Sequence, residues 1–221
     1  MWGRHRQALI LSIIGAIAAF LVAVTLIATL YHAPSCTDDK QNQGEMGVDC
    51  GGPCSHLCTL DEQAAQVLFV RPLTQQPGRT DLVAQIANKN SDAAAKNVPY
   101  TATLYGSDGG VLATKTGTVD LPPGSSVPIF IPAMYSGFQQ AGQAFITLDN
   151  ASAYWYRYTD TRPLVSTSNV VVTPGDTPRA TANLSNPTAF PILDLPVIIT
   201  IYDASNNAIA ASRTVVDEVP P

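Results

Sequence analysis

The sequence predicts an all-β protein that follows a single N-terminal transmembrane α-helix and a disulfide-rich segment. Three observations support this: an uncharged apolar run over residues 8–31, four cysteines within residues 36–58, and short apolar runs separated by turn residues from there onward. The net charge is −5 and no basic cluster follows residue 6. A nucleic-acid partner is therefore not expected, because such surfaces gather Lys and Arg.

The apolar run reads ALILSIIGAIAAFLVAVTLIATLY over residues 8–31. A helix of about 20 apolar residues already crosses the hydrocarbon of a bilayer, whereas the apolar part of a cleavable signal peptide has only about 7–15 residues. We therefore expect an uncleaved signal anchor that contacts membrane lipid along residues 8–31. Two arginines precede it and two aspartates follow it, so the positive-inside rule places residues 1–7 in the cytoplasm and the rest of the chain outside.

Residues 32–63 hold every cysteine of the chain, namely Cys36, Cys50, Cys54 and Cys58. Outside the cytoplasm thiols oxidise, so an even number of closely spaced cysteines predicts disulfide bonds. Two bonds can form and three pairings remain open. Because the segment contains few apolar residues, we expect these bonds, rather than a hydrophobic core, to hold an extracytoplasmic stalk together.

A metal site is the alternative for the same residues. Zinc would use a cysteine and histidine set, namely Cys50, Cys54, His56 and Cys58. The spacing of that set lacks the C-x₂-C pairs typical of zinc sites, which disfavours zinc. Calcium would use oxygen donors, namely Asp38, Asp39, Asn42, Glu45 and Asp49. Their spacing differs from the EF-hand loop, but carboxylate and amide oxygens suit calcium, so calcium is kept as a candidate cofactor.

Residues 36–54, CTDDKQNQGEMGVDCGGPC, resemble a cysteine motif of secreted and surface-anchored proteins of bacteria and archaea, C-x-D-G-x-x-N-x-x-E-x-G-x-D-C-G-G-x-C. The matching residues are Cys36, Asp38, Asn42, Glu45, Gly47, Asp49, Cys50, Gly51, Gly52 and Cys54. Asp39 replaces a glycine of the motif, which disfavours a positive φ at that position. The resemblance implies an extracellular module and no particular chemistry.

Beyond Cys58, apolar runs recur about every ten residues. The runs cover residues 67–70, 82–87, 100–105, 127–132 and 144–148. Turn clusters such as QQPG, KNSD, GSDGG and LPPGSS separate them. This alternation is typical of the strands and turns of an antiparallel β-sandwich.

The β region also contains an internal repeat. The correspondences are Pro77-Gly78 with Pro174-Gly175 and Thr103–Tyr105 with Thr200–Tyr202 at an offset of 97, and Asn90 with Asn186 at an offset of 96. A period near 97 residues is about the length of one immunoglobulin-like domain. We therefore predict tandem immunoglobulin-like β-sandwiches, the first over residues 64–163 and the second over residues 164–221.

Two short stretches of the repeat resemble the signature of FxLYD-type domains, which are small immunoglobulin-like modules of prokaryotic cell-envelope proteins. They are TLYGSDG at residues 103–109 and ITIYDASNN at residues 199–207. The aromatic residue of the signature is replaced by Ala102 in the first copy and by Ile199 in the second. The resemblance implies tandem modules of a cell-envelope surface protein.

The second copy is shorter than the first, which continues past Pro123 for about forty residues. An immunoglobulin-like domain without its last strands would expose apolar faces and unpaired edges. We therefore expect the second sandwich to be incomplete because the sequence is a truncated gene product. The alternative is that a partner supplies the missing strands by β-augmentation.

We expect a non-enzymatic membrane protein that binds or scaffolds an envelope protein or polymer. None of the three histidines falls in the predicted sandwiches, and the sequence lacks the G-x-S-x-G, H-E-x-x-H and phosphate-loop motifs. One alternative is an assembly subunit completed by strand donation. Another is a carbohydrate-binding surface at the aromatic cluster of residues 154–158, where Trp155 would anchor the core and Tyr154, Tyr156 and Tyr158 would line the opposite face, although a last strand that packs between the domains is favoured.

Overall fold

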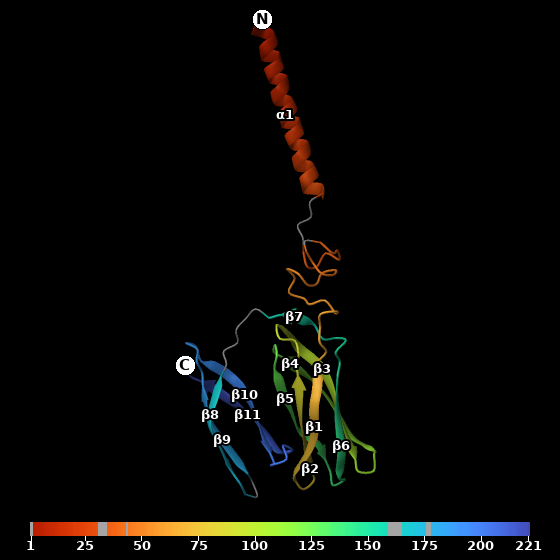
Figure 1. The fold of residues 1–221 in the computed structure, drawn as a ribbon, viewed down its shortest axis with the longest axis vertical. Helices are drawn as coiled ribbons and strands as arrows, with labels where there is room; N and C mark the ends of the chain where they lie inside the picture. The colour runs from red at the N-terminus through yellow and green to blue at the C-terminus, as the bar shows by residue number, and fades with distance from the viewer. Residues whose placement is uncertain (1, 31–34, 43, 159–164, 176–177) are drawn as a thin grey trace. The chain divides into compact units, whose positions relative to one another are not determined.

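The computed structural model describes residues 2–30, 35–42, 44–158, 165–175 and 178–221 (Figure 1). The predicted anchor end at Tyr31 and the predicted boundary between residues 163 and 164 lie outside these residues. The chain divides into two compact units, Met1–Cys54 and Ser55–Pro221. The first holds one apolar helix and a disulfide-bonded loop, and the second is built of β-strands, so the coarse fold prediction is confirmed.

Helix α1 spans Trp2–Leu30. Its sequence is rich in Ala, Leu and Ile and contains no proline, which suits a continuous helix. Every side chain from Arg6 to Leu30 is exposed, and this stretch is long and apolar enough to cross a membrane. Its three hydroxyl-bearing residues, Ser12, Thr25 and Thr29, each donate a hydrogen bond to a carbonyl one turn earlier.

Seven antiparallel strands form the first part of the β unit. They are β1 (Gln66–Gln76), β2 (Arg79–Ala87), β3 (Ala93–Gly106), β4 (Val111–Leu121), β5 (Ser126–Ser136), β6 (Ala141–Leu148) and β7 (Trp155–Arg157). One sheet has the order β1-β2-β5 and the other has the order β4-β3-β6, with β7 also paired to β3. All five apolar runs expected from the sequence lie within these strands, and the predicted turn clusters lie at or between their ends.

The core of this part draws on both sheets. Alternate residues of β2, Leu82, Ala84 and Ile86, are fully buried because side chains of a strand point alternately to its two faces. Leu104 of β3 and Trp155 of β7 belong to the same buried cluster. Burying each large apolar side chain contributes about 1.5–3 kcal/mol, so this cluster is the main source of stability in the unit.

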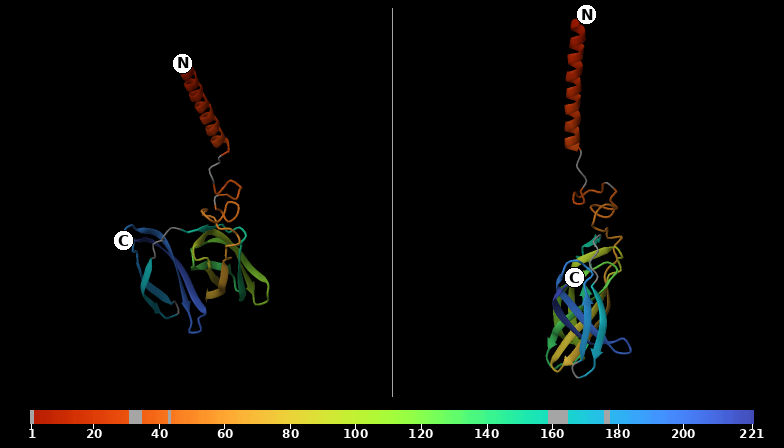
Figure 2. Two further views of the ribbon diagram at one scale, coloured as in Figure 1. Left: turned by 45° about the horizontal axis from the view of Figure 1, so that its top comes forward. Right: turned by 90° about the vertical axis from the view of Figure 1, so that its left-hand side faces the viewer.

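The second part of the β unit has two hairpins (Figure 2). Strands β8 (Ser166–Thr173) and β9 (Arg179–Ser185) form one two-stranded sheet, and β10 (Ile192–Tyr202) and β11 (Ala208–Val219) form the other. The order and pairing repeat those of β1–β2 and β3–β4.

Backbone details repeat at the same offset of 97 residues. Asn97 and Asp194 both have positive φ, at 53° and 51°, and so do Gly109 and Asn206 in the two hairpin turns. In the first turn the Gly106 N–H donates to the Gly110 carbonyl, and in the second the Asp203 N–H donates to the Asn207 carbonyl. The repeat seen in the sequence therefore corresponds to a repeat of turn geometry.

The predicted correspondence between Asn90 and Asn186 is wrong. Asn186 has the structural role of Asn88 rather than that of Asn90. The Nδ2 of each donates to a carbonyl 33 positions later, Leu121 at 3.3 Å and Val219 at 3.1 Å. The Oδ1 of each accepts the N–H two positions later. The buried amide joins the end of one hairpin strand to the end of another, and side-chain identity alone did not reveal which asparagine does so.

The two parts of the β unit contact each other beside β11. Leu73 and Val83, on the outer face of the first sheet, form a small buried cluster with Ala208 and Ala211. The Arg71 Nη2 donates a hydrogen bond to Asn207 Oδ1 at 2.8 Å.

Candidate functional site

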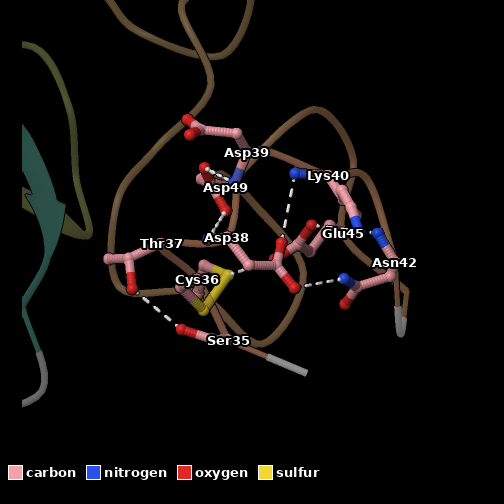
Figure 3. Close-up of a disulfide and its surroundings, with 10 residues drawn as sticks. Ser35, Cys36, Thr37, Asp38, Asp39, Lys40, Asn42, Glu45 and Asp49 are labelled. Carbon is pink, nitrogen blue, oxygen red and sulfur yellow. Dashed lines mark hydrogen bonds between the residues drawn. A yellow bond between two sulfur atoms is a disulfide. The ribbon is translucent and has the colours of Figure 1, made fainter. Parts of the chain in front are cut away.

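The disulfide-bonded loop after α1 is the strongest candidate site from the sequence. Cys36 and Cys54 form a disulfide bond across 18 positions (Figure 3). Cys50 and Cys58 are also disulfide-bonded, and no cysteine among the described residues is free. The prediction of disulfide bonds is confirmed. The sequence could not choose the partner of Cys36, because all three pairings were compatible with the spacing.

The carboxylate of Asp49 organises the first turn of this loop. Its Oδ1 accepts the N–H of Asp38 and its Oδ2 accepts the N–H of Asp39, both at 2.9 Å. Asp39 has a φ of 57°, so it keeps the left-handed conformation that the glycine of the resembling motif would adopt. Aspartate is one of the few residues that tolerate this region, and here the Asp49 carboxylate stabilises the turn.

Asp38 and Glu45 fix the next turn in the same way. Asp38 accepts hydrogen bonds from the Lys40 N–H at 3.1 Å and from Asn42 Nδ2 at 2.9 Å (Figure 3). The Glu45 Oε2 accepts the N–H of Asn42 at 3.1 Å. Glu45 is itself buried, and its Oε1 lies 3.1 Å from Cys54 Sγ. The acidic residues thus hold the backbone of a loop that has little apolar surface of its own.

Two glycines of the loop are required by its geometry. Gly51 and Gly52 have φ values of 69° and 54°, which favour glycine. A Cβ atom on Gly52 would also lie only 2.1 Å from the carbonyl oxygen of Gly44. Any side chain at residue 52 would therefore displace the backbone of the facing turn.

The loop is poorly suited to bind a zinc ion. The only close group of three candidate ligands in the described part of the chain is Cys36, Glu45 and Cys54, and both sulfur atoms belong to the disulfide bond. The proposed zinc set contains three oxidised cysteines, and zinc requires thiolates.

For calcium, the carboxylates of Asp38, Glu45 and Asp49 already accept hydrogen bonds from the loop. These bonds account for three of the five predicted donors without an ion, whereas the buried Asn42 Oδ1 has no hydrogen-bond partner among the described residues. Calcium bound by the five predicted oxygen donors stays a prediction.

Residues 55–65 belong with the β unit rather than with the stalk predicted over residues 32–63. Leu57 is 7% exposed and joins the core, and its N–H donates to the Trp155 carbonyl at 3.0 Å. Burial raises the pKa of Glu62, while the nearby His56 acts in the opposite direction. The contact between Leu57 and Trp155 could not be predicted from the sequence, because the two residues lie about a hundred positions apart.

The aromatic residues at positions 154–158 have different environments in the structure. Trp155 is 1% exposed and lies in the core, as favoured from the sequence. Tyr154 is 55% exposed, but its ring stacks on His56 with the centroids 4.3 Å apart. The Lys96 ammonium lies 5.9 Å from the ring centroid of Tyr156, and the backbone N–H of Tyr158 donates to the Asp92 carbonyl. One face of Tyr154 is therefore already covered by an imidazole, which weakens the interpretation as a carbohydrate-stacking surface.

Comparisons with family models, with curated proteins and with solved structures gave no match.

The loop after α1 is closed by a disulfide bond and held by its own internal hydrogen bonds. It can hold a short polar segment rigid next to an apolar helix.

Proposed function

We propose that the chain is a non-enzymatic, single-pass membrane protein that presents its β unit outside the cytoplasm, for binding or scaffolding in the cell envelope. The observation that carries the proposal is the direct succession of an uncovered apolar helix and an oxidised loop. Every side chain from Arg6 to Leu30 is exposed, and the cysteines that follow are disulfide-bonded. A helix of this kind needs lipid, and disulfide bonds persist in oxidising compartments.

The polar groups of α1 support a position within the bilayer. In hydrocarbon, an unpaired hydroxyl group costs several kcal/mol. Ser12 and Thr29 donate to the carbonyls of Leu9 and Thr25 at 2.9 Å and 2.7 Å. Thr25 donates to the carbonyl of Leu21 in the same way. Between residues 8 and 30 these are the only polar side chains, so the helix needs no outside partner for them.

The β unit supports the assignment to tandem immunoglobulin-like modules of the FxLYD type. Two antiparallel sheets share one core in the first part, and the second part repeats the order and turn geometry of the first four strands. Together with the resemblance of residues 36–54 to a prokaryotic surface motif, this favours an envelope protein. We propose an envelope protein or polymer as its partner, and no nucleic acid.

The topology can be tested by labelling engineered cysteines in intact cells. The wild-type cysteines are oxidised, so single additions of Gln7→Cys and Ser205→Cys report on the two sides of α1. We expect a membrane-impermeant maleimide to label the variant at residue 205 in intact cells and the variant at residue 7 only after permeabilisation. Two results would contradict the proposed function. One is the reverse labelling pattern, and the other is labelling of the wild-type cysteines after permeabilisation, because that would show reduced thiols in the cytoplasm.

A further inference from the structure

A cleft of about 590 Å³ lies where the turn between β3 and β4 meets the start of β6. Strand β3 and its turn contribute Tyr105, Ser107 and two glycines to its walls, and β6 contributes Gly142, Gln143 and Phe145. The volume lies within the range of about 300–1,000 Å³ that is usual for ligand pockets. All these residues belong to the first part of the β unit, whose core is closed by both of its sheets.

Backbone forms part of the cleft wall, because its glycines carry no side chains. A Cβ atom on Gly142 would lie 2.8 Å from the Gly106 carbonyl oxygen and 3.2 Å from the Ser107 nitrogen. Glycine is therefore needed for the close approach of β6 to the turn. The Ser107 N–H also donates to the Gln140 carbonyl at 3.0 Å. The two walls are thus held together by the chain itself, and the cleft is formed before any ligand arrives.

Two aromatic rings border the cleft. The rings of Tyr105 and Phe145 meet edge to face, with their centroids 5.9 Å apart. Phe145 is 55% exposed, whereas its neighbours Ala144 and Ile146 are buried in the core. Phe145 therefore points away from the core and presents an apolar surface that the packing of the first part does not use.

The polar groups of the cleft are uncharged. Among the described residues, none with a charged side chain lines it. The nearby Asp108 carboxylate accepts the Gly110 N–H within the turn at 3.0 Å. The Lys115 ammonium donates to the Ala133 carbonyl of β5 at 2.7 Å. A charged ligand would lose its hydration without gaining a counter-charge, so the cleft favours a neutral one.

The remaining polar groups match the chemistry of a sugar. The hydroxyl of Ser107 and the amide of Gln143 can each donate and accept hydrogen bonds, as sugar hydroxyl groups do. An exposed aromatic ring offers an apolar face to the C–H groups of a sugar ring. The cleft combines these two features, which a neutral sugar needs together.

The outer face of the β4-β3-β6 sheet continues this surface with hydroxyl groups. The outward residues next to Phe145 are threonines on all three strands, namely Thr101 and Thr103 of β3, Thr114 and Thr116 of β4 and Thr147 of β6. From residue 101 to residue 105 the strand extends about 14 Å, at about 3.4 Å per residue. The face therefore has room for more than one sugar unit.

We propose that this cleft binds a neutral sugar unit of an extracytoplasmic polysaccharide. The sugar ring stacks on Phe145, Ser107 and Gln143 bind its hydroxyl groups, and the adjoining units lie along the threonines. The proposal deepens the proposed function, on which it rests, by naming a neutral polysaccharide as the polymer partner. The site is distinct from residues 154–158, where the Tyr154 ring is already stacked on His56.

The test uses the full chain in lipid nanodiscs, titrated calorimetrically with linear hexasaccharides. The neutral probes are hexamers of glucose, mannose and N-acetylglucosamine, and the matched anionic probe is a hexamer of galacturonate. We expect saturable binding of at least one neutral hexamer and at least tenfold weaker binding of the galacturonate hexamer. Amide hydrogen exchange over residues 105–109 and 142–147 should become slower when the neutral hexamer is bound.

Two phenylalanine variants provide a matched comparison. Phe145→Thr removes the stacking ring but keeps a β-branched residue in the strand, so binding of the neutral hexamer should weaken at least tenfold. Phe138→Thr makes the same change at a residue that is 92% exposed and does not line the cleft, and it should leave binding within twofold. Both side chains lie outside the core, so both variants should fold.

The proposal is overturned if no neutral hexamer binds at millimolar concentration, if the galacturonate hexamer binds more tightly, or if the two phenylalanine variants bind equally well. Slower exchange confined to residues 154–158 would assign the sugar to the other aromatic cluster and would also overturn it. So would protection of residues 105–109 in a dimeric chain before sugar is added, because that result assigns the face to a second copy. The labelling of residues 7 and 205 does not depend on the cleft, so failure here with the expected labelling would leave the proposed function standing.

Discussion

Strand β2 is paired on both edges, whereas its counterpart β9 has one neighbouring strand among the described residues, and this difference separates the two parts of the β unit. In the first part Leu104 is fully buried, while Ile201, at the same place in the repeat, is only partly buried. Local sequence and turn geometry produce the same hairpins in both parts. Strands β5, β6 and β7 bury the apolar faces of the first part, and the described residues of the second part include no counterparts of these strands.

The largest expected contrast between the parts is between two aromatic residues. Trp155→Ala should lower the free energy of unfolding by about 3–5 kcal/mol, because it leaves a cavity in the core. Phe190→Ala should change it by less than about 0.5 kcal/mol, since Phe190 is 77% exposed. Denaturant unfolding of the full chain in detergent, followed by far-UV circular dichroism, measures both. Equal costs would show that the second part is packed as tightly as the first.

The two equivalent asparagines give a sharper comparison, because their hydrogen bonds are alike. Asn88 Nδ2 donates to the carbonyls of Ala93 and Pro122 at 2.8 Å and 2.7 Å, in addition to Leu121, and Asn186 Nδ2 donates to two carbonyls. We expect Asn88→Ala to cost about 2–3 kcal/mol and Asn186→Ala about 1 kcal/mol, because Asn88 loses hydrogen bonds to three carbonyls and Asn186 loses two, one of them to the carbonyl of the exposed Phe190. The same unfolding experiment applies, with exposed Lys89→Ala as the control. A larger cost for Asn186→Ala would reverse the comparison.

The smallest effect concerns the turn between β10 and β11. The pKa of Asp203 is lowered, chiefly because its carboxylate accepts the N–H of Asn207, with a further bond from the N–H of Ser205. A lowered folded-state pKa contributes stability above the unfolded value of about 3.9, and this contribution is lost as the pH falls through the folded value.

Carboxyl NMR titration should place the midpoint of Asp203 below about 3.9, with faster amide exchange over residues 203–207 below that midpoint. Asp203→Asn keeps an acceptor and should remove this pH dependence. A midpoint at or above the usual value would contradict the turn geometry.

The sequence was sufficient to locate features that depend on local pattern. The uncharged run predicted α1, and the apolar runs predicted β1, β2, β3, β5 and β6. Features set by distant contacts were not accessible. Three such features are the pairing of Cys36 with Cys54, the backbone hydrogen bond from Leu57 to Trp155 and the equivalence of Asn186 with Asn88, because each depends on which segments meet in space. Asp39 was expected to disfavour a positive φ, but the Asp49 carboxylate stabilises that turn.

The central claim is that both parts share one strand plan and that, among the described residues, only the first closes a core. Amide hydrogen exchange of the full chain in lipid nanodiscs tests it most directly, because exchange reports the free energy of local opening. We expect the amides of residues 82–86 to exchange at least about 100-fold more slowly than those of residues 180–184, equivalent to roughly 2.8 kcal/mol at 1.4 kcal/mol per tenfold. Equal protection of the two segments would contradict the claim.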